Sequence, residues 1–390
     1  QQQPRHALIV GAGLAGCAAA WALAEQGWTS TVIDRHTAPA QEASGNPGGL
    51  FHGIVNPQDG AHARFNRAAA LEAQRVVRQA IAEHGVLGQA EGMLRLEPSM
   101  RDAAAMHEQL MQLGLPPDYV QALSADQASS LCGLPLRHSA WFYPGGGWVA
   151  PAALAQALLA IAGEGTSHRG GVEVQALRRS ATGWELLDAR GDVIAASETV
   201  VLANAFDALR LLGAPAWPVE KVRGQISIWQ PDAAARAGLA APRIPIAGAG
   251  YLLPLAGAQL VFGATSAAGD ADPSVRLGDH VHNLAQLNRL TDGLFSHLQP
   301  QDLQGRTAWR MVSGDRLPIV GAVPDMAAVS AASARRLDHP RFVPRLPGLF
   351  VFTALGSRGF TWSALGAQVL ASCVTGAPQP LEKAQRALAL

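Results

Sequence analysis

Three glycines near the start of the chain have the spacing of a turn that binds phosphate. Gly11, Gly13 and Gly16 form a Gly-x-Gly-x-x-Gly pattern directly after the apolar run at residues 7–10. In such a turn the first glycine allows a tight bend, the second lets backbone approach a pyrophosphate, and the third lets a helix pack on a strand. The N–H groups at the start of that helix can bind phosphate oxygens. The predicted phosphate-binding residues are Gly11, Ala12, Gly13, Leu14, Ala15 and Gly16.

A carboxylate stands where the ribose of a dinucleotide would be bound. Asp34 follows the second apolar run, residues 30–33, at about the 20-residue spacing typical of dinucleotide-binding folds. A carboxylate there can accept both ribose hydroxyls and would repel a 2′-phosphate, which argues against NADP. Arg35 is the next residue, and we include it among the predicted cofactor contacts. This pattern alone leaves FAD and NAD open.

Three further segments favour FAD, because an extended cofactor needs contacts from distant parts of a chain. Residues 43–49 are rich in glycine, residues 199–204 form a strand that runs into a small-residue turn, and residues 356–359 open a helix. The start of that last helix offers N–H groups to a pyrimidine oxygen of flavin. The residues of these segments predicted to bind FAD are Ser44, Gly45, Asn46, Gly48, Gly49, Ala203, Asn204, Gly356, Ser357, Arg358, Gly359 and Phe360.

The elements that must position these residues alternate between strand and helix. Residues 7–10 and 30–33 are predicted parallel strands around a helix that ends near residue 26, and residues 349–353 predict a strand before a helix from about residue 362. The sequence therefore predicts an α/β fold with a discontinuous, Rossmann-like FAD-binding domain at residues 1–88, 144–215 and 305–390. An inserted α+β substrate domain, dominated by an antiparallel sheet, is expected at residues 89–143 and 216–304.

Composition limits the remaining classes of protein. The chain has 390 residues, of which 48% are hydrophobic and 15% charged, against a usual charged share of about 25%. This composition excludes disorder, and the length suits two domains. The 30 basic and 30 acidic residues balance, so any nucleic acid must be bound by a local patch.

Metal and membrane functions are not indicated. The three cysteines are scattered and the 12 histidines show no metal-ligand spacing, which favours a reducing cytoplasm and no metal. We expect Cys17 to be a small buried hydrophobic residue. The uncharged stretch at residues 244–269 contains Pro245, Pro254 and five glycines, so it predicts a pair of strands and no membrane span.

Several motifs together resemble the D-amino-acid oxidase/glycine oxidase superfamily of flavoproteins. Within it, the sequence is most similar to the FAD-dependent C-terminal half of the bifunctional enzymes that make 5-methylaminomethyl-2-thiouridine at the tRNA wobble position. The segments that carry this resemblance are residues 43–50, 143–151, 250–254, 262–265, 309–321 and 353–360.

The resemblance implies a reaction and a partner. It implies oxidative removal of the carboxymethyl group from 5-carboxymethylaminomethyl-(2-thio)uridine in tRNA, which leaves the 5-aminomethyl base and releases glyoxylate. The methyltransferase half is absent from these 390 residues, so we expect an excised domain or a free-standing version. The alternative is an FAD-dependent oxidase of free glycine, sarcosine or D-amino acids.

The resemblance also implies substrate-binding residues. Arg310 matches the superfamily pattern Arg-x-x-x-x-Asp-x-x-Pro-x-x-Gly, whose arginine binds the substrate carboxylate, and Arg358 and Tyr251 match further residues near the substrate. Each arginine could instead form a structural ion pair, and Arg310 could pair with Asp315. No thiol lies near the Arg310 motif and no histidine lies in the turn at residues 356–359, so non-covalent FAD is expected.

Two basic clusters are candidates for contact with RNA. Either could bind phosphates with a salt-dependent affinity, and either could be an ordinary solvated surface. The first is a helical stripe of Arg64, Arg67, Arg75 and Arg78, and the second is a loop with Arg335, Arg336, His339, Arg341 and Arg345.

Overall fold

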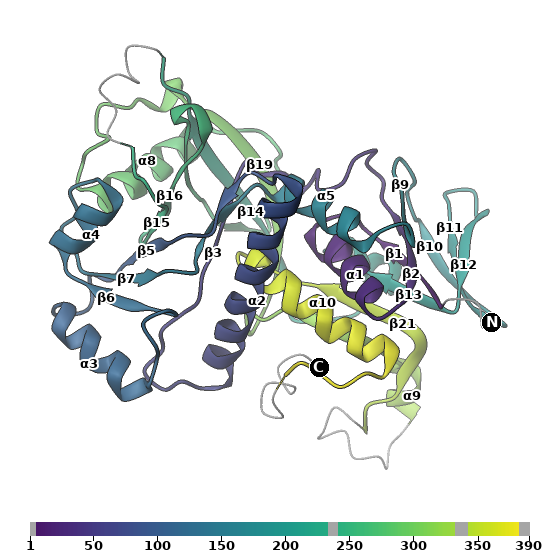
Figure 1. The fold of residues 1–390 in the computed structure, drawn as a ribbon. Coiled ribbons are helices and arrows are strands. Elements are labelled where there is room, and N and C mark those ends of the chain that lie inside the picture. The colour runs from purple at the N-terminus through teal and green to yellow at the C-terminus, as the bar shows by residue number, and fades with distance from the viewer. Residues whose placement is uncertain (1–4, 233–240, 332–341, 382–390) are drawn as a thin grey trace. The chain divides into compact units, whose positions relative to one another are not determined.

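The structure is a computed structural model that describes residues 5–232, 241–331 and 342–381. Contacts divide the chain into two compact units (Figure 1). Unit 1 comprises Gln1–Gly45, Ala152–Glu220 and Arg310–Leu390, and unit 2 comprises Asn46–Pro151 and Lys221–Trp309. Each unit is described below by itself.

Unit 1 is built on a largely parallel sheet. In its described part six strands lie in the order β20-β21-β13-β1-β2-β9, parallel except for the antiparallel edge pair β20 and β21. The central strands are short apolar runs that are buried along most of their length, as expected for strands covered on both faces. The strands are β1 (His6–Val10), β2 (Thr29–Ile33), β9 (Thr166–Arg169), β13 (Thr199–Leu202), β20 (Ile319–Pro324) and β21 (Arg345–Thr353).

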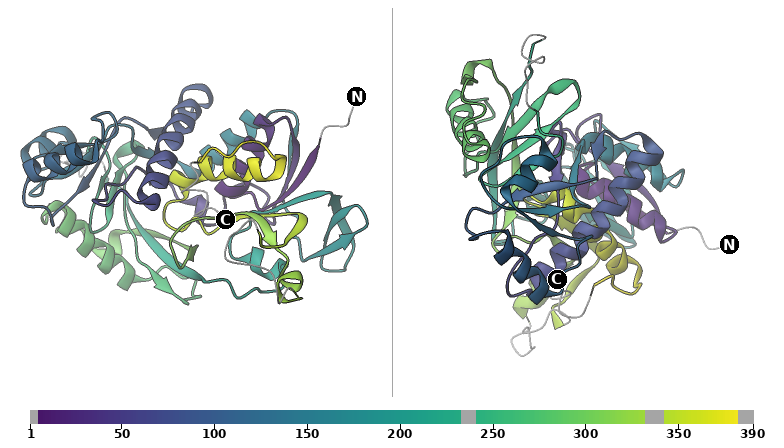
Figure 2. Two further views of the ribbon diagram at one scale, coloured as in Figure 1. Left: turned by 90° about the horizontal axis from the view of Figure 1, so that it is seen from below. Right: turned by 60° about the vertical axis from the view of Figure 1, so that its left-hand side comes forward.

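Helices and a small antiparallel sheet complete unit 1. Helix α10 (Gly359–Thr375) contacts α1 (Leu14–Glu25), and the views in Figures 1 and 2 agree on this pairing. Both helices are buried along most of their length, which suits the many small and apolar residues in their sequences. The other elements are α5 (Pro151–Ala162), α6 (Asp207–Leu211), α9 (Met326–Ala331), the 3-10 turn at Ala43–Gly45, and the meander of β10 (Ala176–Ser180), β11 (Gly183–Leu187) and β12 (Val193–Ser197).

Unit 2 contains a mostly antiparallel sheet, called here the unit 2 sheet. Its described strands run in the order β18-β14-β17-β16-β15-β5-β7-β6, and β19 also pairs with β14. Only the β15–β5 pair is parallel among the strand pairs with a defined register. The strands are β5 (Met93–Leu96), β6 (Gln121–Leu123), β7 (Ala140–Tyr143), β14 (Val219–Trp229), β15 (Ile246–Ala247), β16 (Tyr251–Pro254), β17 (Leu260–Gly263), β18 (Ala267–Ala268) and β19 (Gln304–Ser313).

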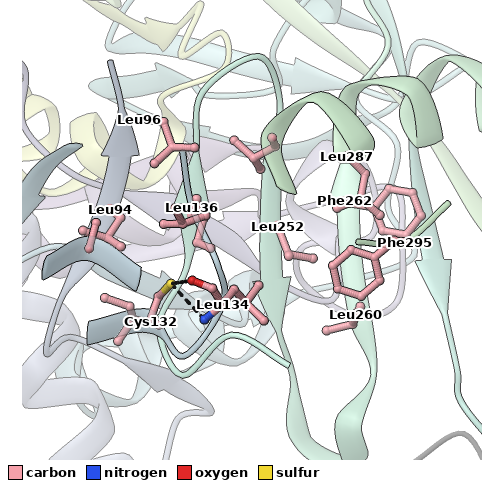
Figure 3. Close-up of a cluster of buried hydrophobic side chains, with 14 of the residues drawn as sticks. Leu94, Leu96, Cys132, Leu134, Leu136, Leu252, Leu260, Phe262, Leu287 and Phe295 are labelled. Carbon is pink, nitrogen blue, oxygen red and sulfur yellow. Dashed lines mark hydrogen bonds between the residues drawn. The ribbon is translucent and has the colours of Figure 1, made fainter. Parts of the chain in front are cut away.

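One face of the unit 2 sheet forms a hydrophobic core with two helices. Leu94, Leu252 and Phe262 from the sheet pack with Leu287 of α8 and with Cys132 of α4 (Figure 3). Burial of such side chains stabilises the fold by roughly 1.5–3 kcal/mol each. The helices of unit 2 are α2 (Ala61–His84), α3 (Ala103–Leu113), α4 (Ala125–Cys132) and α8 (Leu277–Thr291), with 3-10 turns at Ala256–Ala258 and Pro300–Asp302.

A second, smaller sheet in unit 2 changes the expected division of the chain. Strands β3 (Gly49–Phe51) and β4 (Gly88–Gln89) both pair with β8 (Gly147–Val149). The expected FAD-binding domain included residues 46–88 and 144–151, whereas contacts group both segments with unit 2. The two segments are grouped together because β3 in the first pairs with β8 in the second.

A fully buried arginine on β14 forms hydrogen bonds with the first turn of α8 and with the loop before it. The Arg223 side chain is 0% exposed, and it donates to Asp279 Oδ2 at 2.6 Å, to Asp272 O at 2.7 Å and to Ser274 O at 2.6 Å. Further bonds to Gln225 Oε1 and Thr307 Oγ1, both at 3.3 Å, use the remaining donor capacity. The guanidinium is therefore structural, and it is saturated by the protein.

Replacing Arg223 with methionine should lower the free energy of unfolding by about 3 kcal/mol, because the Asp279 carboxylate loses its buried partner. The matched control is Arg137→Met, which breaks the exposed ion pair with Asp292 and should cost about 0–1 kcal/mol. Urea unfolding measures both changes. An equal loss in the two variants would contradict the structural role of Arg223.

In the described ranges, no helix is both long enough and apolar enough to cross a membrane.

Candidate active site

The glycine turn of unit 1 joins β1 to α1 and allows two very close backbone approaches. Gly11 has φ +104°, and a Cβ built there would lie 2.8 Å from backbone atoms of Ala203 and Asn204. A Cβ on Gly16 would overlap the carbonyl oxygen of Gly11. The first glycine therefore lets the turn contact the end of β13, and the third lets α1 start directly against the turn.

The N-terminus of α1 is free of acidic side chains and is capped from another segment. Gly13 provides no side-chain cap, and the first turn of the helix contains no acidic residue. Instead, the Leu14 N–H donates to Ser44 Oγ at 3.2 Å. Since the hydroxyl accepts this bond, its own proton can be donated to a further acceptor, such as a phosphate oxygen. The predicted residues Leu14 and Ser44 are thus brought together.

Asp34 lies at the end of β2, beside the glycine turn. Its Oδ2 accepts the Ala12 N–H at 2.6 Å, and its Oδ1 accepts the His36 N–H at 2.8 Å. Each carboxylate oxygen can accept more than one hydrogen bond. The carboxylate is therefore held in place by backbone and retains acceptor capacity for hydroxyl donors.

Arg35 is engaged in a local ion-pair cluster. Its Nη2 lies 2.6 Å from Glu42 Oε1, and His36 Nε2 lies 2.8 Å from the same oxygen. Burial opposes ionisation of Glu42, but the hydrogen bonds from His36 and Arg35 outweigh it and lower the pKa of the carboxyl. The structure thus gives Arg35 a role in fixing the loop after β2.

The end of β13 carries a buried polar atom that has no hydrogen-bond partner in the described ranges. Ala203 N donates to Val10 O at 2.8 Å, which places the next residue, Asn204, beside the glycine turn. Asn204 Nδ2 donates to Asp207 Oδ2 at 3.3 Å, and the hydrogen bond from Arg210 holds the pKa of Asp207 below its usual value. Asn204 Oδ1 is buried and has no hydrogen-bond partner among the described residues. A bound ligand with a donor would satisfy this acceptor.

The C-terminal turn brings the two candidate arginines into one part of unit 1. Gly356 N donates to Met311 O at 3.0 Å, and a β-bridge joins Val312 to Leu355. Arg310 therefore lies on the strand that contacts the turn carrying Arg358. Both arginines are half-buried.

The other residues of this turn lie at the start of α10, which begins three residues before the predicted position. Gly356 has φ +54°, Ser357 is exposed, and Arg358 is the N-cap of α10, so that Gly359 and Phe360 start the helix. Asp315, the alternative partner considered for Arg310, accepts the Leu317 N–H at 3.0 Å.

The remaining predicted residues belong to unit 2, apart from Gly45, which ends the 3-10 turn of unit 1. Asn46 Oδ1 accepts from Arg306 Nη1 at 2.9 Å, so this amide anchors the start of the segment. A Cβ on Gly48 would meet the Leu253, Leu255 and Trp148 side chains at 3.2–3.3 Å. The glycine therefore lets this segment pack closely on the unit 2 sheet.

Gly49 begins β3, where it pairs with Val149. Tyr251 begins β16 and is half-buried, against the two hydrophobic clusters that include Tyr143 and Leu253. The structure thus places Tyr251 on a defined face of the unit 2 sheet.

The FAD dependent oxidoreductase family, DAO, matches residues 6–373, nearly the whole chain. The chain belongs to this family.

Curated relatives of the oxidoreductase share one name. The chain is 49% identical over 386 residues to the tRNA 5-methylaminomethyl-2-thiouridine biosynthesis bifunctional protein MnmC of Methylibium petroleiphilum. The match covers 97% of this chain and 58% of that protein. The protein of the same name from Burkholderia multivorans is 41% identical over 382 residues, covering 97% and 57%. The chain therefore spans less than two thirds of the length of these relatives.

Solved structures show the same fold. Glycine oxidase from Geobacillus kaustophilus superposes with a TM-score of 0.72 at 21% identity, covering 98% of each chain. Iminodiacetate oxidase from Chelativorans sp. BNC1 superposes with a TM-score of 0.71 at 23% identity, covering 96% of this chain and 97% of that one.

The residues of unit 1 fit the cofactor of an FAD-dependent oxidoreductase. The glycine turn allows close backbone approach, Asp34 has acceptor capacity left for hydroxyl donors, and the buried Asn204 Oδ1 has no donor among the described residues. Two features of this part of unit 1 could not be predicted from the sequence: the cap of Leu14 by Ser44 and the unsatisfied Asn204 oxygen. Both depend on contacts between segments, and the sequence showed only a polar residue next to a glycine-rich turn in each case.

Cys17 of the oxidoreductase behaves as a buried hydrophobic residue, which confirms the expectation. It is 0% exposed, and burial raises the pKa of its thiol to about 12, with a further contribution from Asp34. The reactive thiolate is therefore scarce at neutral pH. In the described ranges no cluster of histidine, cysteine, aspartate or glutamate has the arrangement of a metal site.

Two of the four arginines in the stripe on α2, Arg67 and Arg75, pair with carboxylates, whereas Arg64 and Arg78 form no ion pair with any residue that the structure describes. Arg67 forms a paired contact with Asp59 at 2.9 and 3.0 Å, Arg75 pairs with Glu72, and Arg78 donates to Ala90 O. These partners weaken the case for the stripe as an RNA surface. In the second cluster Arg345 donates to Ala322 O at 2.7 Å. Arg335, Arg336, His339 and Arg341 lie outside the described residues.

Proposed function

We propose that this chain oxidises the N-substituted glycine carried by a modified wobble uridine of tRNA. The carboxymethyl group of 5-carboxymethylaminomethyl-(2-thio)uridine would leave as glyoxylate, and 5-aminomethyl-(2-thio)uridine would remain. The observation that carries this proposal is the 49% identity, over 97% of the chain, to a protein named for synthesis of a tRNA base. Since the chain covers 58% of that protein, the proposal leaves the methyltransferase step to a separate domain.

The chemistry needs a carbon with a secondary amine on one side and a carboxylate on the other. Bound FAD supplies a two-electron acceptor for this carbon. Loss of hydride from the carbon and of the proton from nitrogen gives an imine. Water adds to the imine carbon, and the C–N bond breaks to give the aldehyde of glyoxylate and a primary amine on the base. The protein must bind the carboxylate, orient the carbon and keep the amine unprotonated.

The proposed roles follow from the chemistry of each side chain. Arg310 binds the substrate carboxylate, because a guanidinium forms two parallel charge-assisted hydrogen bonds with it. Arg358 assists this binding, and Tyr251 donates to the carboxylate or accepts from the amine. FAD is bound without a covalent link, by the glycine turn and Asp34 of unit 1, the segment at residues 44–49, Ala203 and Asn204, and the turn at residues 356–360.

The test is to mix the FAD-loaded protein without oxygen with tRNA bearing the carboxymethylaminomethyl group. We expect the flavin absorbance to fall and the 5-aminomethyl nucleoside to appear by mass spectrometry, together with glyoxylate. The control is the same tRNA without the carboxymethyl group, which should leave the flavin oxidised. Reduction only by glycine, sarcosine or D-alanine would contradict the proposal and favour the alternative, an oxidase of free amino acids.

A further inference from the structure

One face of the unit 2 sheet carries an arginine that no described residue of the chain pairs with. Arg95 lies on β5 between Leu94 and Leu96, whose side chains belong to the hydrophobic core on the other face (Figure 3). Because side chains alternate along a strand, Arg95 lies on the opposite face. It is half-buried, and it forms no hydrogen bond, ion pair or ring contact with any residue that the structure describes. A partly desolvated guanidinium of this kind favours an anionic ligand.

The strand pairing places Arg95 on the same face as Tyr251. Arg95 pairs with Ala247 of β15, and Ala247 pairs with Tyr251 of β16. Two strand spacings, about 10 Å, therefore separate the backbones of Arg95 and Tyr251. Only the small side chain of Ala247 stands between them. On the far side Arg95 pairs with the buried Trp141 of β7.

The nearest acidic residue along this face does not neutralise Arg95. Glu97 follows Arg95 by two positions, and its Oε1 accepts a hydrogen bond from the Ser99 hydroxyl. It forms no ion pair with Arg95 within the described part of the chain. The face thus combines an aromatic hydroxyl, a small side chain and a positive charge in one row across three strands.

We infer that Arg95 binds a backbone phosphate of the tRNA substrate. This inference rests on the proposed function, and it names a contact beyond the reacting tail. In a modified nucleotide the glycine-like tail extends from C5 of the base and the phosphates are attached to the ribose, so the two anionic groups are separate and each can have its own cationic partner. Tyr251 serves the tail in the proposed function, and a guanidinium two strands away suits a phosphate. A free amino acid has no second anion that could occupy Arg95.

The test measures the affinity of the FAD-loaded protein for tRNA by fluorescence anisotropy over a range of salt concentrations. Arg95→Gln should weaken binding about tenfold and reduce the salt dependence by about one phosphate contact. Arg95→Lys should keep most of the salt dependence, because the charge remains. The matched control is Arg101→Gln, which removes an exposed arginine of the same unit that pairs with Asp102, and its affinity should change less than twofold.

Three results would overturn the inference. The first is an unchanged tRNA affinity in Arg95→Gln, with thermal unfolding confirming that the variant is folded. The second is an equal loss in Arg95→Gln and Arg101→Gln. The third is an equal loss of affinity for tRNA and for sarcosine, where sarcosine binding is measured from the change in the flavin spectrum. Such a result would place Arg95 at the substrate carboxylate. Failure of the proposed function can be distinguished from failure of this inference. In the former case the unaltered protein would convert no modified tRNA.

Discussion

Arg310→Ala should lower kcat/KM for the carboxylate-bearing substrate about 1000-fold, mainly through KM, while FAD remains bound. The expected size follows from the loss of two charge-assisted hydrogen bonds in a partly desolvated site, which costs about 4 kcal/mol. Arg310→Lys should recover only part of the loss, because an ammonium cannot form the paired bonds of a guanidinium. Steady-state kinetics with modified tRNA, together with the flavin absorbance of the purified variants, measure these effects.

The control for Arg310 is Arg316→Ala, which removes an exposed arginine from the same segment and should leave KM within about twofold of the unaltered value. An unchanged KM in Arg310→Ala would show that another group binds the carboxylate, and Arg358 would then be the first candidate. Loss of FAD from the Arg310 variant would indicate a structural role.

Gly16→Ala should reduce the affinity for FAD more than about 1000-fold. The added Cβ would overlap the carbonyl oxygen of Gly11, so α1 would have to move away from the glycine turn. Backbone cannot shift cheaply in a close-packed region, and the N–H groups that start the helix would leave the position where they meet phosphate. The measurement is titration of the apoprotein with FAD, with thermal unfolding as a second readout.

Gly278→Ala provides the matched control, because Gly278 also lies in a helix and a Cβ there would meet nothing within 4 Å. This change should leave FAD binding intact and stabilise α8 by up to about 1 kcal/mol. Normal FAD affinity in Gly16→Ala would show that the turn tolerates a displaced helix, and would weaken the assignment of the diphosphate to this turn.

The elements around the glycine turn could be predicted from the sequence because their signals are local. An apolar run, a glycine pattern and an alanine-rich helix lie within 20 residues of one another in the sequence, and the structure places β1, the turn and α1 there. The strand predicted at residues 349–353 is the second half of β21 (Arg345–Thr353), and its signal was local for the same reason. Periodicity and turn residues suffice when neighbours in sequence decide the structure.

Contacts between distant segments decided the rest, and the sequence holds little signal for them. The bond from Arg306 to Asn46 and the cap of Leu14 by Ser44 join segments that no periodicity connects. The spacing of the α2 arginines predicted a stripe, but it did not reveal that Asp59, which precedes the helix, would pair with Arg67. The pairing of β3 with β8 likewise moved two segments into unit 2.

The strand order of the unit 1 sheet has a consequence for synthesis on the ribosome. Strand β13 lies between β1 and β21, and β21 follows β13 by more than a hundred residues in the sequence. Until β21 emerges, one edge of β13 has unpaired backbone groups, which invite pairing with other chains. During that interval the exposed edge of β13 is a site where pairing with another chain would lead to aggregation.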